Sequence, residues 1–557
     1  MTKRPIVMYS LSFFMGCLSF LFYINNVYLG AVLAASFLYI IFIKKEIIYF
    51  LIITSFFLTG FFRITTYFNY HPNGEERIRI IKANNNYIVG EARGRKLNIT
   101  GEINELEEGR LILARGEFSK DINYKRGVIG SYNITKYKNL KEDLIYKFSN
   151  YKSNVIEKLS EYLDEDELSL VVSLCFGDVE GLHEIDKFKL QKLGVIHAVS
   201  VSGFHISIVY KFIEMLVGSG GALLCTLFYA IFTGLSYSTL RAFIMIFVLY
   251  LSKRVYKKYD GISSLSLAFI LILLHKPYSF MEMGFALSFL ATLGIILHDK
   301  QVKSFLKGLP KKLQDSLSIT LSAQIFTLPY IAFTINSFSL GFLLGNIFLV
   351  PIFSFVVVLG NMSLFLIKFP ILFKFLSYIL YGFCNLIQYI SYLLIRISPS
   401  MYYLGFYEGV YFMILYFSYI MVRKGRDKFK FLPLISFIVI LFNIITIFPT
   451  INFINNEYVK GAIIRYNSEC IMVCNYNLEQ GKELTDIKDR YKVAKVITDI
   501  EKNFEINLKK YKANIIYGQE DILGIKFKKK NDTLFIPADK GDNTYRIIFG
   551  RIFRWRD

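Results

Sequence analysis

From Leu168 to Pro449 the sequence is almost entirely apolar and is broken only by short polar or basic loops. A helix needs roughly 17–25 apolar residues to cross a bilayer, and three earlier runs, at 6–24, 27–43 and 47–62, approach or reach that length. With 54% hydrophobic and 17% aromatic residues, the chain is too apolar for an ordinary soluble protein. We therefore predict a polytopic α-helical membrane protein. Further spans are expected near 193–217, 222–236, 238–251, 263–275, 280–298, 317–335, 338–367, 371–397, 401–422 and 431–448.

The formal net charge of +21 suggests basic cytoplasmic loops, an anionic partner, or both. Lys3, Arg4, Lys44 and Lys45 flank the first runs, and the positive-inside rule places them in the cytoplasm. After three crossings the chain is then outside from Arg63 onward. We expect a multi-pass protein of the cytoplasmic membrane, in contact with its lipid, with extracytoplasmic soluble domains. The later basic clusters that fall on the cytoplasmic side are 253–258, 300–312 and 423–430.

Residues 63–160 are polar and contain no run long enough to span a membrane. Short alternating segments, separated by glycine, asparagine and charged clusters, predict a small bent β-domain, a five-stranded barrel of the OB type. The stretch 63–158 carries 18 Lys/Arg against 12 Asp/Glu. Such a surface could follow a nucleic-acid backbone, or it could simply be solvated. The cations that would contact nucleic acid are Arg93, Arg95, Lys96, Arg110 and Arg115.

Polar residues gather in one apolar segment, HAVSVSGFHI at 197–206. Polar side chains at membrane depth normally face a bundle interior or a water-filled path. On a helix, positions 198, 202 and 205 share a face, so Ser202 and His205 would point together. Gly203 would let another backbone approach closely or would break the helix. The candidates for lining a path, here and on other segments, are Gly177, Asp178, His197, Ser202, Gly203, His205, Arg241, Gln324 and Asn346.

Structural roles are equal alternatives for several of these candidates. Gln324 and Asn346 could form interhelical hydrogen bonds. Arg241 could bind a phosphate, or it could form an ion pair with Glu282 or Glu214. A carboxylate at Asp178 would repel DNA, so a structural cap or a proton-coupled role is as plausible there.

The segments LCFGD (174–178) and HAVSVSGFHI (197–206) resemble the signature of the ComEC competence proteins, the inner-membrane channels of natural transformation. Two positions depart from that family's pattern: Ser200 stands where alanine is usual, and Ala286 replaces a glutamine. The resemblance implies a channel that transports single-stranded DNA, with a DNA receptor on the outer side and an ATP-driven motor on the cytoplasmic side. Further segments similar to family motifs, in the same order, are SYSTLRAFIMIF (236–247), GFALSFLATLGI (284–295), SAQIFTLPY (322–330) and LLGNIFLVPIFS (343–354).

Residues 451–557 are polar again and are expected to hold strands with one helix between them, within 493–518. Many members of the resembled family carry a metallo-β-lactamase-like domain here, and its metal site needs a histidine-rich cluster. The last of the six histidines in this chain is His298. We therefore expect a degenerate, metal-free α/β domain without a nuclease site, with Asp499–Asn503 where the metal loop would be. The six scattered cysteines are interpreted as small hydrophobes, and no cofactor is expected.

Four parts are thus predicted: N-terminal membrane helices (1–62), the extracytoplasmic β-domain (63–160), a competence-type channel domain (161–450) and the C-terminal domain (451–557). The sequence contains no G-x-x-x-x-G-K-[ST] phosphate loop, so inward movement of DNA would need a separate motor or a gradient. The leading hypothesis is a channel without enzymatic activity. The alternatives are a membrane-embedded enzyme that uses the His197/His205 cluster with Asp178, or a transporter of another polyanion.

Overall fold

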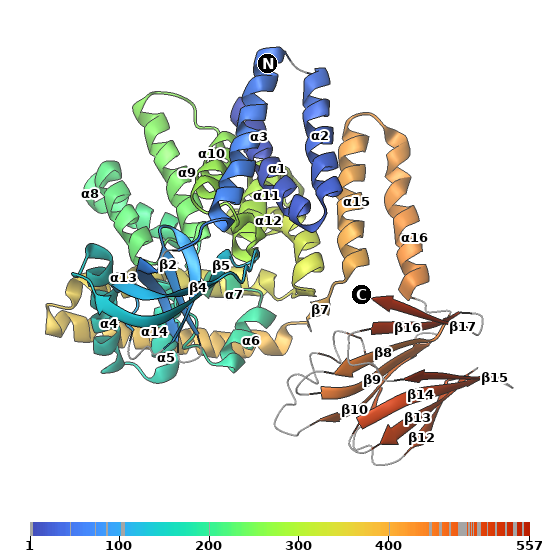
Figure 1. Ribbon diagram of the computed structural model, residues 1–557. Helices are drawn as coiled ribbons and strands as arrows, with labels where there is room; N and C mark the ends of the chain where they lie inside the picture. Colours follow the sequence, from blue (N-terminus) through green and yellow to red (C-terminus); the bar gives the residue numbers. More distant parts are fainter. Residues whose placement is uncertain are drawn as a thin grey trace. The chain divides into compact units, whose positions relative to one another are not determined.

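The computed structural model divides into two compact units, Met1–Thr327 with Gly341–Ser398, and Leu328–Leu340 with Pro399–Asp557 (Figure 1). Ser200 and residues 499–502 of the expected metal loop lie outside the part of the chain that the structure describes. The described residues are 4–44, 46–72, 74–84, 87–101, 106–199, 201–399, 401–444, 448–455, 459–466, 469–476, 487, 491, 493, 495–497, 503–508, 511–518, 521–529, 532–537, 543–548 and 551–556.

The first three apolar runs form three helices, as predicted. Two of them, α1 and α3, approach closely because each presents a glycine to the other. A Cβ on Gly16 would overlap the carbonyl of Phe57, and a Cβ on Gly60 would overlap that of Phe13. Small residues permit this kind of helix contact in a membrane. The helices are α1 (Pro5–Asn25), α2 (Val27–Lys44) and α3 (Ile47–Phe68).

After these helices, the first five strands close into a barrel in the order β1-β2-β3-β5-β4. In it β3 is parallel to β5, and β1 pairs with β4. Side chains alternate between the two faces of each strand, so Ile112 and Ala114 of β4 are buried. The five-stranded barrel predicted from the sequence is confirmed. Its strands are β1 (Glu75–Asn84), β2 (Tyr87–Ala92), β3 (Arg95–Gly101), β4 (Leu111–Ser119) and β5 (Val128–Asn139).

The barrel is fastened to the membrane helices by specific contacts. Lys96 Nζ lies 3.1 Å from Glu282 Oε1, which also accepts a hydrogen bond from the Tyr237 hydroxyl at 3.0 Å. Gly127 turns with φ +68° directly against the ring of Tyr278, where a Cβ would overlap that ring. Only glycine adopts such a conformation without strain. Within the first unit, the barrel is therefore held in a defined position against the membrane helices.

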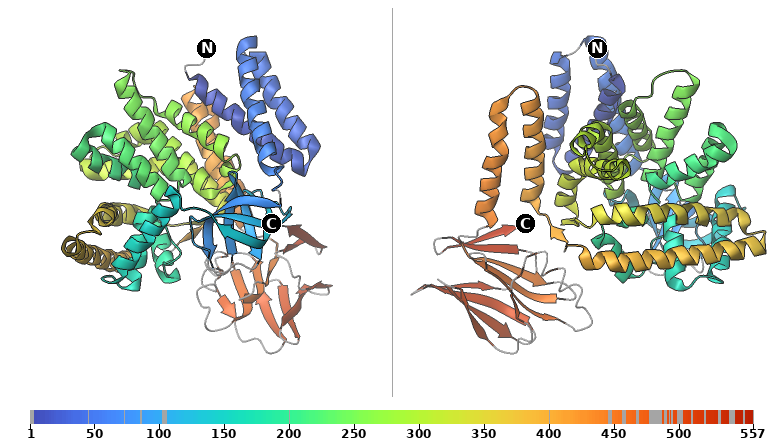
Figure 2. Two further views of the ribbon diagram at one scale, coloured as in Figure 1. Left: turned by 60° about the vertical axis from the view of Figure 1, so that its left-hand side comes forward. Right: turned by 180° about the vertical axis from the view of Figure 1, so that it is seen from behind.

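Two hydrophobic cores hold the first unit together. One includes residues of α5, α8, α13 and α14, and the other joins α10 and α11 to α1, α3 and the barrel. Figure 2 shows α13 and α14 side by side, running across the direction of α1 and α3. The remaining helices of the first unit are α4 (Leu144–Ser160), α5 (Glu165–Phe176), α6 (Glu184–Lys192), α7 (Ile196–Val199), α8 (Gly203–Phe232), α9 (Tyr237–Arg254), α10 (Gly261–His275), α11 (Met283–Phe305), α12 (Lys311–Thr334, which continues into the second unit), α13 (Phe342–Leu366) and α14 (Pro370–Ile397).

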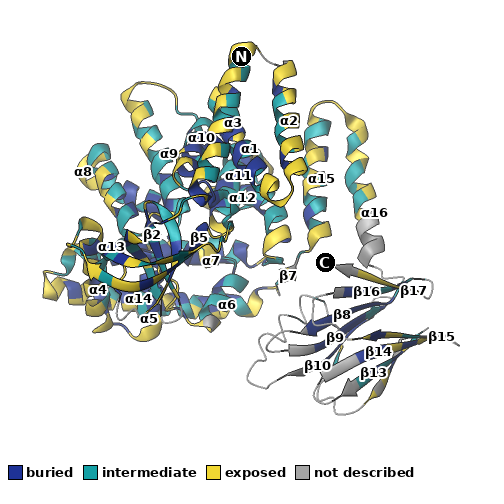
Figure 3. Cartoon of the chain, viewed as in Figure 1, coloured by how far each residue is buried: buried dark blue, intermediate teal, exposed yellow. Residues whose placement is uncertain are grey.

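Seven of the described helices are long and apolar enough to cross a membrane: α1, α3, α8, α11, α12, α13 and α14. Their outward faces carry exposed apolar side chains, such as Leu51 and Phe62 of α3, each more than half exposed (Figure 3). Such surface suits lipid rather than water. The chain is therefore a multi-pass membrane protein.

The span predicted at 193–217 is placed wrongly. Of the described residues in 193–202, only Ile196–Val199 are helical, and α8 begins at Gly203. The helix then runs on into the span predicted at 222–236, with one interruption at Gly218 (φ 75°, ψ 172°). That backbone conformation is essentially confined to glycine. Apolar composition alone does not reveal such breaks.

Among its described residues, the second unit holds the helices α15 and α16, two larger β-sheets and the two-stranded sheet β6-β7. The sheet orders are β11-β10-β9-β8-β16-β17 and β12-β13-β14-β15. The elements are β6 (Ser337–Phe338), β7 (Tyr402–Tyr403), α15 (Phe406–Arg423), α16 (Leu432–Ile444), β8 (Thr450–Asn455), β9 (Val459–Tyr466), β10 (Glu469–Tyr476), β11 (Lys495–Ile497), β12 (Phe504–Leu508), β13 (Tyr511–Gly518), β14 (Asp521–Lys529), β15 (Asp532–Pro537), β16 (Asn543–Ile548) and β17 (Arg551–Arg556).

The helix expected within 493–518 is absent from the described residues of that stretch, which form β11, β12 and β13. Ile506, Ala513 and Ile515 are buried and pack in one core with residues of β8 and β9. The Ala513/Ile515 spacing of two residues is the strand period, and it outweighed the charged, helix-like composition. The likeness to a metallo-β-lactamase stays a prediction.

Substitution of Gly60 by alanine is expected to destabilise the protein, because the new Cβ would meet the Phe13 carbonyl. Overpacking of this kind costs about 1–3 kcal/mol, measurable as a lower melting temperature in detergent. The matched control is Gly284→Ala in α11, where no described atom lies within 4 Å of the new Cβ. Alanine favours helix there, so equal melting temperatures for the two variants would contradict the close contact.

Candidate functional site

The motif segment 197–206 contains the start of a new helix. Ser202 is the N-cap of α8, and its backbone N–H donates to Nδ1 of His205 at 2.9 Å. The prediction that one helix places positions 198, 202 and 205 on a face is therefore wrong. Ser202 and His205 do meet, but as the first turn of α8, where an N-cap N–H commonly finds an acceptor three residues on.

His205 is 0% exposed. Because Nδ1 accepts a hydrogen bond, the neutral imidazole carries its hydrogen on Nε2. This Nε2 has no hydrogen-bond partner among the residues that the structure describes. A buried donor in this state costs about 1–3 kcal/mol, and such groups usually mark a functional position or a bound water.

Arg241 of α9 lies against the same helix start. Its Nε donates to Ser288 Oγ of α11 at 2.9 Å, and its Nη1 donates to the hydroxyl of Thr292 one turn further. A Cβ on Gly203 would lie 2.7 Å from Nη2 of Arg241, so a larger residue there would displace the guanidinium from its present position. The cation is thus held by neutral hydroxyl groups at the N-terminus of α8.

The two ion pairs considered for Arg241 are not formed. Glu282 pairs with Lys96 and accepts from Tyr237. Glu214 accepts from the hydroxyl of Tyr210 at 3.2 Å. Within the described part of the chain, no carboxylate lies within ion-pair distance of Arg241. The phosphate-binding alternative therefore stays open for this residue, while the ion-pair alternative with either glutamate is wrong.

The backbone just before α8 is clamped from two sides. The hydroxyls of Ser236 and Ser238 donate to the carbonyl of Val201, at 3.4 and 3.1 Å. Gly177 ends α5 with φ +81°, and a Cβ there would lie 3.2 Å from Cγ2 of Val201. The first three motifs, far apart in the sequence, thus meet at the start of α8.

Asp178 is exposed, and its Oδ1 accepts from the backbone N–H of Glu180 at 3.1 Å, as in a turn cap. Glu180 is in turn ion-paired with Lys82 of the barrel. His197 is exposed on α7, and neither it nor His205 is bonded to Asp178 among the described residues. No group of three or more His, Cys, Asp or Glu in that described set could hold a metal ion. The geometry agrees with the structural-cap alternative for Asp178.

The last two candidates lie on other helices. Gln324 Oε1 accepts from the hydroxyl of Thr327, 2.9 Å away and one turn further along α12. Asn346 is on the first turns of α13, beside Gly345, where a Cβ would overlap the carbonyl of Leu193. Gly345, the neighbour of Asn346, therefore lies against the segment that leads into the motif, whereas no side-chain hydrogen bond among the described residues joins Gln324 to that segment.

Most of the five barrel cations have structural partners. Arg95 donates to the carbonyls of Thr66 and Tyr67 at the end of α3, and Lys96 pairs with Glu282. Arg115 alone is exposed without a hydrogen bond or ion pair of its side chain to the described residues. Contact of the five cations with nucleic acid stays a prediction. The remaining pairs are Arg93 with Glu76 (3.5 Å) and Arg110 with Glu107 (3.5 Å) and Glu142 (3.8 Å).

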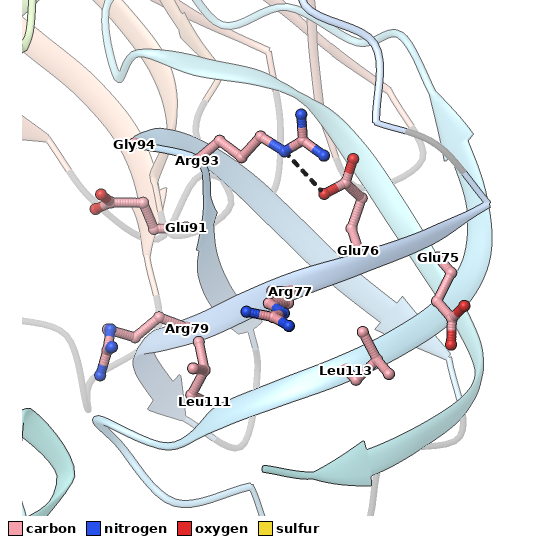
Figure 4. A pocket seen from close by; sticks show the side chains of 9 residues that line it. All are labelled: Glu75, Glu76, Arg77, Arg79, Glu91, Arg93, Gly94, Leu111 and Leu113. Carbon is pink, nitrogen blue, oxygen red and sulfur yellow. Dashed lines mark ion pairs between the residues drawn. The ribbon is translucent and has the colours of Figure 1, made fainter. Parts of the chain in front are cut away.

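A groove of about 460 Å³ crosses the barrel face formed by β1, β2 and β4 (Figure 4). Three glutamates and three arginines share it, so it carries no excess of positive charge toward a polyanion. The lining residues are Glu75, Glu76, Arg77, Arg79, Glu91, Arg93, Gly94, Leu111 and Leu113.

Several polar residues of the cluster were missed by sequence reasoning. Ser288 and Thr292 hold Arg241, and Ser236 and Ser238 hold Val201. The signal that could have found the first two is their spacing of four residues, which puts both hydroxyls on one face of an apolar helix.

Comparison with known proteins finds a match to the family described as "Competence protein" over residues 174–425. The chain is similar to ComE operon protein 3 of Bacillus subtilis, with 27% identity over 285 residues, which is 48% of this chain and 35% of that protein. It is also similar to an uncharacterized protein of Mycoplasma genitalium, MG316, with 31% identity over 159 residues, 27% of this chain and 40% of that protein. The matches thus span well under two thirds of either relative. No solved structure matches this chain.

The ion pair between Arg79 of β1 and Asp143, the N-cap of α4, can be tested through its effect on stability at different pH values. Arg79 pairs with this carboxylate, and that hydrogen bond lowers the pKa of Asp143. A folded pKa below the unfolded value of about 3.9 stabilises the protein at neutral pH, and the contribution is lost as the pH falls through the folded pKa.

Asp143→Asn keeps an N-cap side chain but removes the charge. At pH 7 it should lower stability by at most about 1 kcal/mol, since the pair is partly exposed. Thermal unfolding of the two proteins at a series of pH values should show this gap closing below about pH 4. A gap that stays constant over the whole series would contradict the assignment.

Proposed function

Because this chain belongs to the competence protein family through residues 174–425, we propose that it carries single-stranded DNA across the cytoplasmic membrane during natural transformation. The relative from Bacillus subtilis bears the name of a ComE operon protein. DNA carries a charge on every nucleotide and cannot enter hydrocarbon without a polar path. The proposal therefore needs inward-facing cationic and polar groups among the membrane helices.

The observation that carries the proposal is the guanidinium of Arg241. It lies among apolar membrane helices with hydroxyl partners, Ser288 and Thr292, instead of a carboxylate. Charged residues within membrane segments are costly and mostly functional. A phosphate of the passing strand is the anion that would complete its interactions, since arginine matches phosphate with two parallel hydrogen bonds.

The start of α8 supports the same role. The N-terminus of a helix carries a partial positive charge and free N–H groups that favour anions. The buried Nε2–H of His205 is a further donor in this first turn. In the proposed path these neutral donors contact the DNA backbone weakly, so that a strand binds and also leaves. Gly203 contributes because, without a Cβ, it leaves the space that the guanidinium of Arg241 occupies beside this helix start.

The proposal assigns positions to the other parts of the chain. The barrel would lie on the outer side and present Arg115 and its neighbours to incoming DNA, delivered by a receptor there. An ATP-driven motor on the cytoplasmic side, or a gradient, would supply the work, because the sequence contains no P-loop motif. The C-terminal domain, without histidine after His298, would act in binding or structure.

Arg241→Gln is expected to lower import of labelled DNA about tenfold or more, because a charge-assisted phosphate contact contributes about 1.5–3 kcal/mol. Arg241→Lys should retain part of the uptake, since it keeps the charge but not the planar fork. The measurement is DNA import and transformation frequency in cells that carry only the variant gene.

The matched control is Arg254→Gln, the same change at the opposite end of α9, where the exposed Arg254 donates a hydrogen bond to the hydroxyl of Tyr250. It should import DNA normally. Membrane levels and melting temperatures of all three variants must match the unchanged protein. Normal import by Arg241→Gln at normal levels would overturn the role of Arg241. Unchanged DNA import in cells that lack the whole gene would overturn the proposed function itself and favour another polyanion.

A further inference from the structure

Helix α14 has three distinct faces along its full length. One face is buried in the core of the first unit and includes Phe373, Leu380 and Ile387. A second face is apolar and exposed; Phe375, Leu386 and Leu393 are 65%, 41% and 44% exposed. Residues of each face recur at helical spacing. A helix that only packed in a bundle and faced lipid would need just the first two.

The third face is a stripe of tyrosines and basic groups, which we call the tyrosine stripe. Its four tyrosines are 39% to 62% exposed. The helix contains no acidic residue. At the C-terminal end, the guanidinium of Arg396 lies 4.4 Å from the ring centre of Tyr392. The stripe consists of Lys374, Tyr378, Tyr381, Asn385, Tyr389, Tyr392 and Arg396.

Length and composition would let α14 cross a membrane. A crossing would place the middle of the tyrosine stripe, Tyr381 to Tyr389, at the depth of the hydrocarbon core on the outside of the protein. Polar groups there are expected to turn inward or to find partners. Among the described residues, the side chain of Asn385 has no hydrogen bond. A crossing orientation therefore conflicts with the outward-facing stripe.

The orientation of α14 offers another solution. Figures 1 and 2 show α13 and α14 running across the direction of α1 and α3, within the same compact unit. If α1 and α3 cross the bilayer, a helix that runs across them lies along its plane. Tyrosine is enriched at the boundary between lipid and water, where its ring is apolar and its hydroxyl is hydrated. Lysine and arginine there attract anionic headgroups.

We propose that α14 lies along the membrane–water interface, with the tyrosine stripe toward lipid headgroups and the Phe375/Leu386/Leu393 face in the acyl chains. This assignment is independent of the cargo. It gives each of the three faces the surroundings that its side chains require: protein, hydrocarbon and hydrated headgroups. It also replaces the span predicted at 371–397 with a helix anchored on one surface of the bilayer.

The depth of the apolar face along the helix tests this orientation. The protein has one tryptophan, Trp555, so Trp555→Phe provides a silent background for Phe375→Trp, Leu386→Trp and Leu393→Trp. The purified full chain is placed in liposomes of phosphatidylethanolamine and phosphatidylglycerol that contain nitroxide lipids labelled near the headgroup or near the chain end. The outer two positions are about 27 Å apart along a helix. We expect the same ratio of shallow to deep quenching at all three.

The matched control is a helix that should cross. In α3, the exposed residues Leu51, Leu58 and Phe62 lie on one face, and single tryptophans there should give quenching ratios that change with position. A ratio that changes along α14 as it does along α3 would overturn the proposal. Such a result, with the tyrosine stripe reactive to water-soluble probes, would make α14 a crossing helix that lines an aqueous path.

Discussion

The arrangement of the motif residues depends on the close approach of α9 to the first turn of α8. Gly203 favours this approach, since a Cβ there would lie 3.2 Å from Cβ of Ala242 and would displace the guanidinium of Arg241. The hydroxyls of Ser236 and Ser238 hold the preceding carbonyl of Val201, and Gly177 turns tightly against the same residue. Motifs separated by long stretches of sequence thus form one polar cluster. In a low-dielectric surrounding, such a cluster has to be satisfied by protein or by a ligand.

This cluster is linked to the soluble barrel by electrostatics. Lys96 and Glu282 join β3 to the start of α11, and the Lys82–Glu180 pair joins β1 to the turn that follows Gly177. Lys96, one of the cations predicted to contact nucleic acid, therefore helps to hold the barrel against the membrane helices.

Much of the fold was predictable, because buried apolar residues recur at a spacing that differs between helices and strands and can be recognised in the sequence. The three N-terminal helices and the five-stranded barrel follow from apolar runs and from alternation, both local patterns. The errors arose where tertiary contacts override composition. The break before Gly203 and the interruption at Gly218 are set by packing and glycine conformation, and β12 and β13 formed in a charged stretch because Ile506 and Ile515 share a core with the larger sheet.

The sequence by itself determined that the chain is a membrane protein. It also identified Ser202, His205 and Arg241 as unusual polar residues in apolar surroundings, with Gly203 beside them. The partners of those residues were decided only by the tertiary structure. Arg241 binds Ser288 and Thr292 instead of a glutamate, and one of the two candidate carboxylates, Glu282, is paired with a lysine of the barrel. Pairing of charges depends on distances of a few ångströms between distant segments, and one-dimensional spacing does not contain that information.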